Sequence, residues 1–201
     1  MTAKNIAPLV LAAGQSCRFG SDKLLHTISH QGDEKPLILH SLSSWVEVFP
    51  VVNVVVREDN EALLQLLTGC DISGRLRLIT TANAHKGMSQ SFIAGVKARR
   101  QADGWLVGLG DMPYLDSRVI AASLAALESG AQITLPEFMG RRGHPVGFAA
   151  RFLPQLLALK ADTGARGIIQ SHKKLVYPIQ ADNEGIFRDI DCPEDLQQLD
   201  N

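Results

Sequence analysis

The stretch LVLAAGQSCRFGSDK, from Leu9 to Lys23, carries the strongest signal for the fold and the function of this chain. Its apolar beginning has the length and branching that are typical of a buried parallel strand. A polar loop from Gly14 to Asp22 follows, and its small residues let backbone N–H groups approach phosphate oxygens. Open α/β sheets bind ligands at such loops, which follow the carboxyl ends of their strands. The stretch therefore predicts an anion-binding loop, to which Arg18 and Lys23 add positive charge.

Strand-like and helix-like segments alternate along the rest of the chain. Continuous apolar or β-branched runs predict strands, and apolar residues at helical spacing predict helices. This alternation predicts a right-handed, parallel α/β layer fold. The expected strands cover 8–13, 51–56, 76–80, 104–110, 132–136, 175–179 and 187–190. The expected helices cover 35–49, a segment through Leu67 that Asp59 caps, a segment containing Phe92, Ile93, Val96 and Ala98, then 119–127 and a last helix after Asp195. A small hairpin or exposed turn is expected between Leu24 and Pro36.

Composition limits the partners of the chain. Its 201 residues, 45% of them hydrophobic, suit one globular domain with a sizeable core. A net charge of -1 gives the chain no positive electrostatic field that would attract nucleic acid or anionic lipid. The three cysteines, Cys17, Cys70 and Cys192, form no C-x-x-C pair, so we expect neither a disulfide framework nor a zinc site. The first apolar run is too short for a signal peptide, and no run reaches a membrane span, so a cytoplasmic protein is expected.

Two further polar segments follow expected strands. Small polar residues, with Ser89 and Ser91 among them, begin the third helix, where free N–H groups and the helix dipole favour an anion. These serines are equally good candidates for simple helix caps. Asp111 ends the strand 104–110, while Asp116 already supplies a cap for the next helix. A carboxylate in this position is a hard oxygen ligand placed to hold Mg²⁺ against a triphosphate.

The first loop resembles the signature of nucleotidyltransferases that join a nucleoside triphosphate to a phosphorylated acceptor, L-A-(A/G)-G-x-x-x-R-(M/F)-G-x-x-K. It lacks the ending of a Walker A loop and the G-x-G-x-x-G spacing of a dinucleotide loop. Gly87, Ser91 and Gly95 match the family's G-(M/L)-x-x-S-(I/L/F)-x-x-G segment, which lines its base and ribose pocket. Asp111 matches the metal-binding aspartate of its G-D-x-P motif. These matches extend the resemblance over most of the chain.

Three carboxyl-terminal segments are similar to one branch, the molybdenum cofactor cytidylyltransferases (MocA-like) among the MobA-like NTP transferases. They are the G-H-P segment at His144, the turn 162–166 and the D-I-D-(T/S)-P-x-D segment at Asp191. Asp191 could equally cap the last helix together with Glu194. The resemblance assigns catalysis to Arg18, Lys23 and Asp111; nucleotide binding to Leu11, Ala12, Ala13, Gly14, Ser16, Arg18, Lys23, Gly87, Ser91 and Asp111; acceptor binding to Arg142, His144 and Arg166; and metal binding to Asp111 and Asp191.

The resemblance implies a three-layer, doubly wound, mostly parallel α/β sheet of the Rossmann-like nucleotide-diphospho-sugar transferase type, in one domain spanning 1–201. It implies transfer of CMP from CTP to the terminal phosphate of molybdenum-bound molybdopterin, with Mg²⁺ or Mn²⁺, and a client molybdenum hydroxylase or its chaperone as a further partner. Ala13 favours CTP, because guanylyl-transferring relatives usually have glycine there. Ser16 and His144 favour molybdopterin. The alternatives are a guanylyltransferase of the same cofactor, a sugar-phosphate nucleotidyltransferase, and a non-catalytic nucleotide- or cofactor-binding chaperone for a molybdenum enzyme.

Overall fold

Strand β1 (Ile6–Ala12) lies at the centre of the sheet in the computed structural model, which describes residues 4–15, 19–30, 32–84, 87–160, 164–192 and 194–195. All of its residues are buried, as a continuous apolar run predicts for a strand covered on both faces. It pairs in parallel with β4 (Val52–Arg57) on one side and with β6 (Gly104–Leu109) on the other. The carboxyl ends of these strands therefore meet at one edge of the sheet, where ligands bind in such folds.

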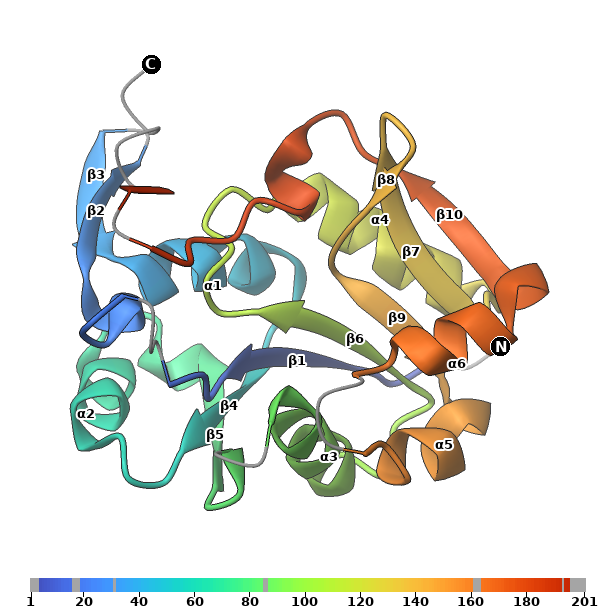
Figure 1. Ribbon diagram of the computed structural model, residues 1–201, viewed down its shortest axis with the longest axis horizontal. Coiled ribbons are helices and arrows are strands. Elements are labelled where there is room, and N and C mark those ends of the chain that lie inside the picture. The colour runs from blue at the N-terminus through green and yellow to red at the C-terminus, as the bar shows by residue number, and fades with distance from the viewer. Residues whose placement is uncertain are drawn as a thin grey trace.

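The other strands of the sheet are β5 (Leu76–Thr81), β7 (Ile133–Phe138), β8 (Arg141–Arg142), β9 (Val146–Ala149) and β10 (Val176–Gln180). Within the described residues, the sheet has the order β10-β7-β9-β6-β1-β4-β5, with β8 beside β7 (Figure 1). β9 is antiparallel to both of its neighbours, and the remaining pairs along this order are parallel. A hairpin of β2 (Thr27–His30) and β3 (Asp33–Pro36) forms a separate sheet.

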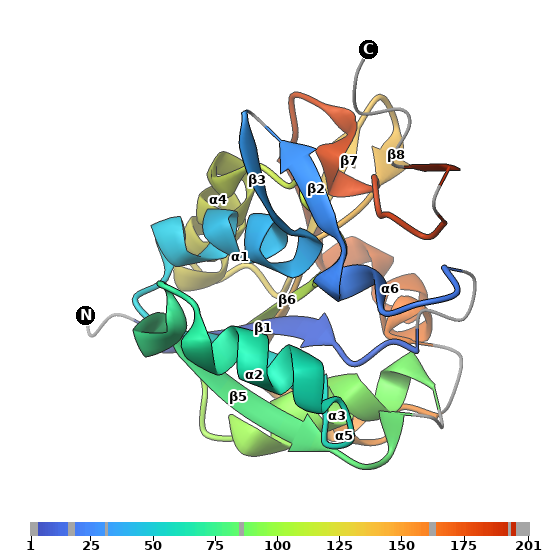
Figure 2. The same cartoon turned by 90° about the vertical axis from the view of Figure 1, so that its left-hand side faces the viewer.

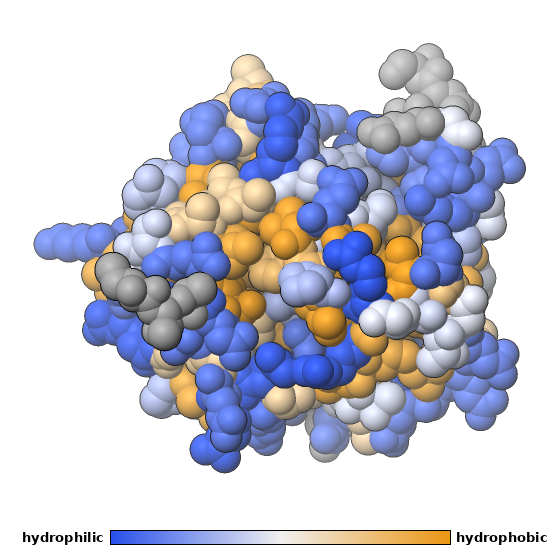
Figure 3. Space-filling model, turned by 180° about the vertical axis from the view of Figure 1, so that it is seen from behind, coloured by the Kyte–Doolittle hydropathy of each residue, from blue (hydrophilic) through white to orange (hydrophobic). Residues whose placement is uncertain are grey.

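Helices cover both faces of the sheet. They are α1 (Leu37–Val48), α2 (Glu61–Gly69), α3 (Met88–Ala98), α4 (Ser117–Glu128), α5 (Leu153–Leu157) and α6 (Arg166–Ser171), with 3-10 turns η1 (Lys23–Leu25), η2 (Ser73–Arg75), η4 (Ala150–Phe152), η5 (Lys173–Leu175) and η6 (Glu184–Ile186). Val10 and Ala12 pack in the cluster with α1, α2 and α4, whereas Leu9 and Leu11 pack in the cluster with α3, α5 and α6. The two helix layers lie on opposite sides of the sheet in Figure 2. The face covered by α1 and α4 shows hydrophobic side chains between hydrophilic ones over its middle (Figure 3).

This architecture confirms the predicted three-layer, doubly wound and mostly parallel α/β sheet, and the predicted strands through β10 lie within two residues of the observed ones. Two local predictions were wrong. α1 begins at Leu37 rather than at 35, because Lys35 and Pro36 pair within the β2–β3 hairpin. Asn60 rather than Asp59 caps α2, because its side-chain oxygen accepts a hydrogen bond from the Leu63 N–H at 3.2 Å.

The carboxyl-terminal part of the chain departs further from the prediction. Residues 187–190 form no strand, and the Ile190 N–H instead donates to the Asp111 carbonyl at 3.0 Å. The short helices α5 and α6 were not predicted, because five or six residues are too few to show helical periodicity. The expected last helix after Asp195 lies outside the described residues. Among the described helices, none combines the length and the hydropathy that crossing a membrane requires.

Candidate functional site

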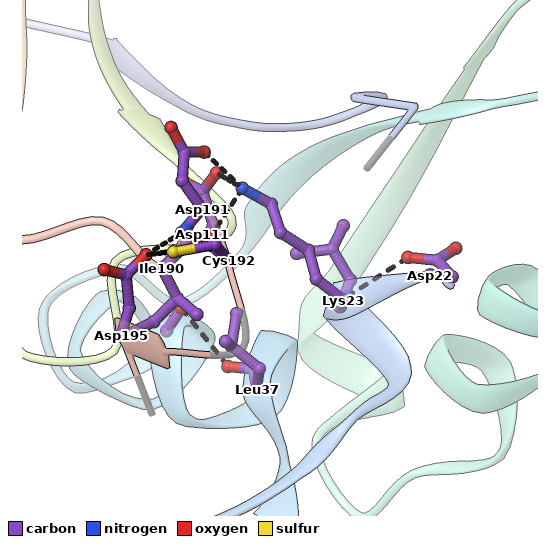
Figure 4. A network of polar contacts seen from close by, with 10 residues as sticks. Asp22, Lys23, Leu37, Asp111, Ile190, Asp191, Cys192 and Asp195 are labelled. Carbon is purple, nitrogen blue, oxygen red and sulfur yellow. Dashed lines mark hydrogen bonds and ion pairs between the residues drawn. The ribbon is translucent and has the colours of Figure 1, made fainter. Parts of the chain in front are cut away.

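The Lys23 ammonium lies at the centre of a cluster of oxygens at the carboxyl edge of the sheet (Figure 4). Its Nζ lies 2.7 Å from Asp111 Oδ2 and 2.9 Å from Asp191 Oδ1, and it donates to the Ile190 carbonyl at 2.6 Å. Only 7% of Lys23 is exposed. The lysine therefore joins a strand end, the first loop and the carboxyl-terminal segment at one point.

Each partner in this cluster is held by its own local structure. The Asp22 carboxylate accepts hydrogen bonds from the Leu24 N–H and the Asn60 amide, which fixes the turn η1 that carries Lys23. The Asp195 carboxylate accepts from the N–H groups of Asp191 and Cys192, both at 2.8 Å. Asp195 therefore orders the turn in which Asp191 points at Lys23.

Charge stabilises the ammonium form of Lys23. Burial alone would lower the pKa of its side chain, but the charges and hydrogen bonds of Asp111, and then of Asp191, outweigh burial and raise the pKa above the ordinary value. One oxygen of Asp111, Oδ1, is buried and has no hydrogen-bond partner among the residues that the structure describes. As predicted, Asp116 caps α4 by accepting from the Arg118 N–H, so Asp111 has no part in that cap.

The oxygen set suits a hard divalent cation. Two carboxylates and a backbone carbonyl are the ligand types that Mg²⁺ and Mn²⁺ prefer, and the unpartnered Asp111 Oδ1 adds a further donor. The residues present therefore fit the predicted metal, with Asp111 and Asp191 as candidate ligands. The ammonium of Lys23 lies between these same oxygens.

A cavity of about 260 Å³ lies beside Asp111. Several predicted nucleotide-binding residues line it, namely Leu11, Ala13, Gly14, Gly87, Ser91 and Asp111. Gly87 is the N-cap of α3 at φ 109°, a backbone conformation that residues with a side chain rarely adopt, and among the described residues no side chain caps this helix. Neither Ser89 nor Ser91 therefore acts as its cap. The predicted Ser16 and Arg18 lie outside the described residues.

A second cavity, of about 530 Å³, adjoins the first and shares Leu11, Met88 and Leu109 with it. The three predicted acceptor-binding residues, Arg142, His144 and Arg166, all line it. Ser89 and Asp189 line it as well, and neither was predicted to bind the acceptor. The two cavities therefore place a smaller and a larger ligand side by side along the strand ends.

Two titratable groups in the larger cavity have shifted pKa values. Burial lowers the pKa of His144, although the Val107 carbonyl and the charges of Asp111 and Asp189 oppose this shift. Desolvation raises the pKa of the Asp189 carboxyl, and the charges of Asp111 and Asp191 raise it further. At neutral pH the imidazole of His144 is therefore uncharged.

Some residues of the predicted motifs have a packing role in the structure. Ala12 packs in the core on the α1 side of β1 and lines neither cavity. Gly95 allows α3 to approach the sheet, because a Cβ there would lie 3.1 Å from side-chain atoms of Leu9 and Val55. Gly143 allows the loop before β9 to pass the Ile186 backbone, which a Cβ would overlap.

Sequence patterns did not predict all contacts of the site. They predicted that Lys23 contacts a phosphate, and for Ser89 they predicted only a helix cap. The ion pair between Lys23 and Asp191 spans 168 residues of sequence, and no local pattern reports such a contact. Asp191, rather than Asp189, is the one of the two aspartates that contacts Lys23.

Similarity to known proteins covers nearly the whole chain. The sequence model of the MobA-like NTP transferase domain matches residues 8–175. The purine catabolism protein PucB of Bacillus subtilis is 26% identical over 202 residues, which cover 99% of this chain and 98% of that protein.

Solved structures share the fold. Rv0371c of Mycobacterium tuberculosis superimposes with a TM-score of 0.79 at 18% identity, covering 98% of this chain and 99% of the other. A second structure of Rv0371c, described as a complex with manganese, gives a TM-score of 0.75 at 19% identity and 97% coverage of each chain. The 4-diphosphocytidyl-2C-methyl-D-erythritol synthase of Anaerococcus prevotii gives 0.72 at 17% identity, covering 98% and 96%.

Proposed function

Because this chain belongs to the MobA-like NTP transferase family, we propose that it is a nucleotidyltransferase that transfers CMP from CTP to the terminal phosphate of molybdenum-loaded molybdopterin. One observation carries the proposal: two cavities adjoin each other, and Asp111, which lines the smaller one, pairs with a buried lysine, Lys23, that also pairs with Asp191. The smaller cavity suits the nucleotide, and the larger one suits a bulkier acceptor. On this proposal the product passes to a client molybdenum hydroxylase or its chaperone in the cytoplasm.

The reaction is an in-line phosphoryl substitution. A terminal phosphate oxygen of the acceptor forms a bond to the α-phosphorus of CTP while the bond to the β-phosphate oxygen breaks, and pyrophosphate leaves with the electron pair. A phosphate monoester is largely ionised at neutral pH, so no side chain has to remove a proton from it. The work of the chain is therefore to align the two ligands and to offset the developing charge.

Lys23 and Arg18 are the cations assigned to that charge. Lys23 is held rigidly and fully charged by its carboxylate partners, which suits a preorganised electrostatic contact. To touch a phosphate, its ammonium has to leave at least one of these oxygens. Arg18 is assigned from the family resemblance alone.

Asp111 and Asp191 are the proposed ligands of Mg²⁺, or of Mn²⁺ in its place. When bound, the metal supplies charge neutralisation to the phosphates. The hard oxygens around Lys23 support this assignment, as does the manganese named for one Rv0371c structure. The unpartnered Asp111 Oδ1 is the atom best placed to take up a metal without a local rearrangement of hydrogen bonds.

The choice of CTP is supported by Ala13. This residue is 5% exposed and lines the smaller cavity, and the family resemblance implies glycine at this position in guanylyl-transferring members. One methyl group is worth only about 1 to 3 kcal/mol of discrimination, so loop hydrogen bonds must supply the rest. Molybdopterin as acceptor is supported by the position of His144, Arg142 and Arg166 around the larger cavity.

Pyrophosphate release tests the proposal directly. The purified chain is incubated with each of the four nucleoside triphosphates and Mg²⁺, with and without molybdenum-loaded molybdopterin, and with a sugar phosphate as the other acceptor. We expect rapid release only with CTP and molybdopterin, and normal release by the control variant Asp59→Asn, which lies outside both cavities. Preference for GTP would refute the cytidylyl assignment, turnover only with a sugar phosphate would refute the acceptor, and no turnover would favour a binding protein.

A further inference from the structure

Two residues that line the larger cavity, Ser89 and His144, each carry a buried polar atom, Oγ and Nδ1, that the described residues leave without a hydrogen-bond partner. Buried polar atoms in native proteins nearly always have a hydrogen-bond partner. Because both residues line the same cavity, a ligand bound there can supply the missing partners. The two atoms come from different elements, the first turn of α3 and the loop before β9.

The Ser89 hydroxyl is not used in capping α3 and is therefore available to a ligand. Only 1% of the residue is exposed, and the N-cap of α3 is Gly87, so the serine hydroxyl makes no capping bond. It lies in the first turn of an 11-residue helix, where the dipole favours a ligand oxygen. The hydroxyl is therefore suited to donate to a carbonyl oxygen in the cavity.

His144 presents the complementary atom. The Val107 carbonyl accepts a hydrogen bond from its ring, and because Nδ1 has no partner, that donor is Nε2–H. Burial keeps the imidazole neutral, so Nδ1 carries a lone pair and accepts hydrogen bonds. A ligand that satisfies Nδ1 must bring an N–H group.

The surroundings of these two atoms select a flat ligand. The cavity walls are mostly apolar side chains, among them Phe92, Val107, Leu135 and Val146. The other charged residues of the lining, Arg142, Arg166 and Asp189, are exposed and therefore lie toward its mouth. Apolar walls with a few buried polar atoms are the usual design of a site for a heteroaromatic ring.

We propose that Ser89 and His144 select the acceptor by reading the lactam edge of a planar heteroaromatic ring, with Ser89 Oγ donating to the ring carbonyl and His144 Nδ1 accepting from the neighbouring ring N–H. The inference rests on the proposed function in taking the larger cavity as the acceptor site. It assigns Ser89 a specificity role and limits the acceptor to ring systems with this edge, a class that includes pterins and excludes simple sugar phosphates.

The first test measures binding without turnover. Quenching of the fluorescence of 6-carboxypterin, a soluble lactam probe, is titrated against the full chain in the absence of nucleotide, with ribose 5-phosphate as competitor. We expect Ser89→Ala and His144→Gln each to weaken binding roughly 5- to 100-fold, since each leaves a buried ligand group unpaired. Ribose 5-phosphate should not compete, and Ser123→Ala, which alters a buried serine of α4 away from the cavity, should bind normally.

The two histidine variants separate a hydrogen-bond role from a structural one. The amide of Gln lies near the position of Nε2, whereas the amide of Asn lies near that of Nδ1. We therefore expect His144→Asn to retain most of the binding that His144→Gln loses. Equal losses in the two variants would refute the role assigned to Nδ1, and circular dichroism checks that each variant is folded.

Steady-state kinetics separate this inference from the proposed function. Ser89→Ala should raise the KM for the acceptor and leave the KM for CTP unchanged, whereas Ser91→Ala in the smaller cavity should do the opposite. Normal transfer to molybdopterin by Ser89→Ala and His144→Gln would overturn the inference and leave the proposed function standing. Serine-dependent pterin binding without transfer to molybdopterin would support the inference and refute the proposed function. A wild-type chain that binds no pterin would overturn the inference.

Discussion

Replacing Lys23 by Met should make the nucleotide-free chain bind Mn²⁺ more tightly. In the wild-type chain, the Lys23 ammonium lies 2.7 Å from Asp111 Oδ2 and 2.9 Å from Asp191 Oδ1, so a metal that uses these oxygens must displace it. Methionine has a similar length and no charge. The variant therefore leaves two carboxylates and the Ile190 carbonyl without their cation.

The magnitude follows from the contacts that the metal no longer has to break. A hydrogen bond to a charged group contributes about 1.5 to 3 kcal/mol. The contact with Asp111 contributes this full free energy because both side chains are largely buried. The Asp191 side chain is 46% exposed, so solvent screening leaves its contact a small contribution. The expected gain in Mn²⁺ affinity is roughly 10- to 100-fold.

Electron paramagnetic resonance of free Mn²⁺ measures this affinity without turnover. Lys35→Met serves as the matched control, because Lys35 pairs with Asp33 at 2.8 Å outside the cluster. The double variant Lys23→Met with Asp111→Asn should lose the gain. Unchanged or weaker Mn²⁺ binding by Lys23→Met would refute competition between the ammonium and the metal. The same variant should lose transfer activity by orders of magnitude, because its preorganised positive charge is gone.

Three further predictions concern single residues. Asp111→Asn should abolish transfer in a chain that remains folded by circular dichroism, and near-normal turnover would remove Asp111 from the reaction. Because the folded-state pKa of His144 is lowered, the unfolded chain binds more protons as pH falls through 6.5, so the free energy of unfolding should decrease from pH 7.5 to pH 5. Urea titrations should show a smaller decrease for His144→Gln, and an identical one would contradict this assignment. Gly143→Ala should destabilise the chain by about 1 to 3 kcal/mol, because its Cβ overlaps the Ile186 backbone, whereas Gly167→Ala has open space and should be neutral or stabilising in thermal melts.

The sequence predicted those features that local patterns encode. The apolar run of β1, the glycines of the first loop and the strand end at Asp111 are each contained in a few neighbouring residues, and the structure places them as expected. Periodicity also located α1 to α4, because each is long enough to show an apolar stripe.

The features that were missed depend on contacts between distant parts of the chain. β9 runs antiparallel to β6 and β7, and the loop before it passes the Ile186 backbone; local periodicity predicts neither of these contacts. Residues 187–190 have the composition of a strand, yet they bond to the Asp111 carbonyl and to Lys23 instead of to a sheet. The unpaired atoms of Ser89 and His144 become visible only when burial is known.

The reach of Lys23 to Ile190 and Asp191 also sets an order of events during synthesis. The ribosome releases all residues that line the smaller cavity, from Leu11 to Asp111, long before residue 190, so this cavity has its lining while the lysine still lacks its contacts with Ile190 and Asp191. A nascent chain at that stage has the smaller cavity but an incomplete cation site, since of the two described carboxylates that pair with Lys23 only Asp111 has been made. The cation site is thus completed after the sheet. A chain that ends before residue 190 keeps the strands of the sheet but lacks the Ile190 and Asp191 oxygens of that site.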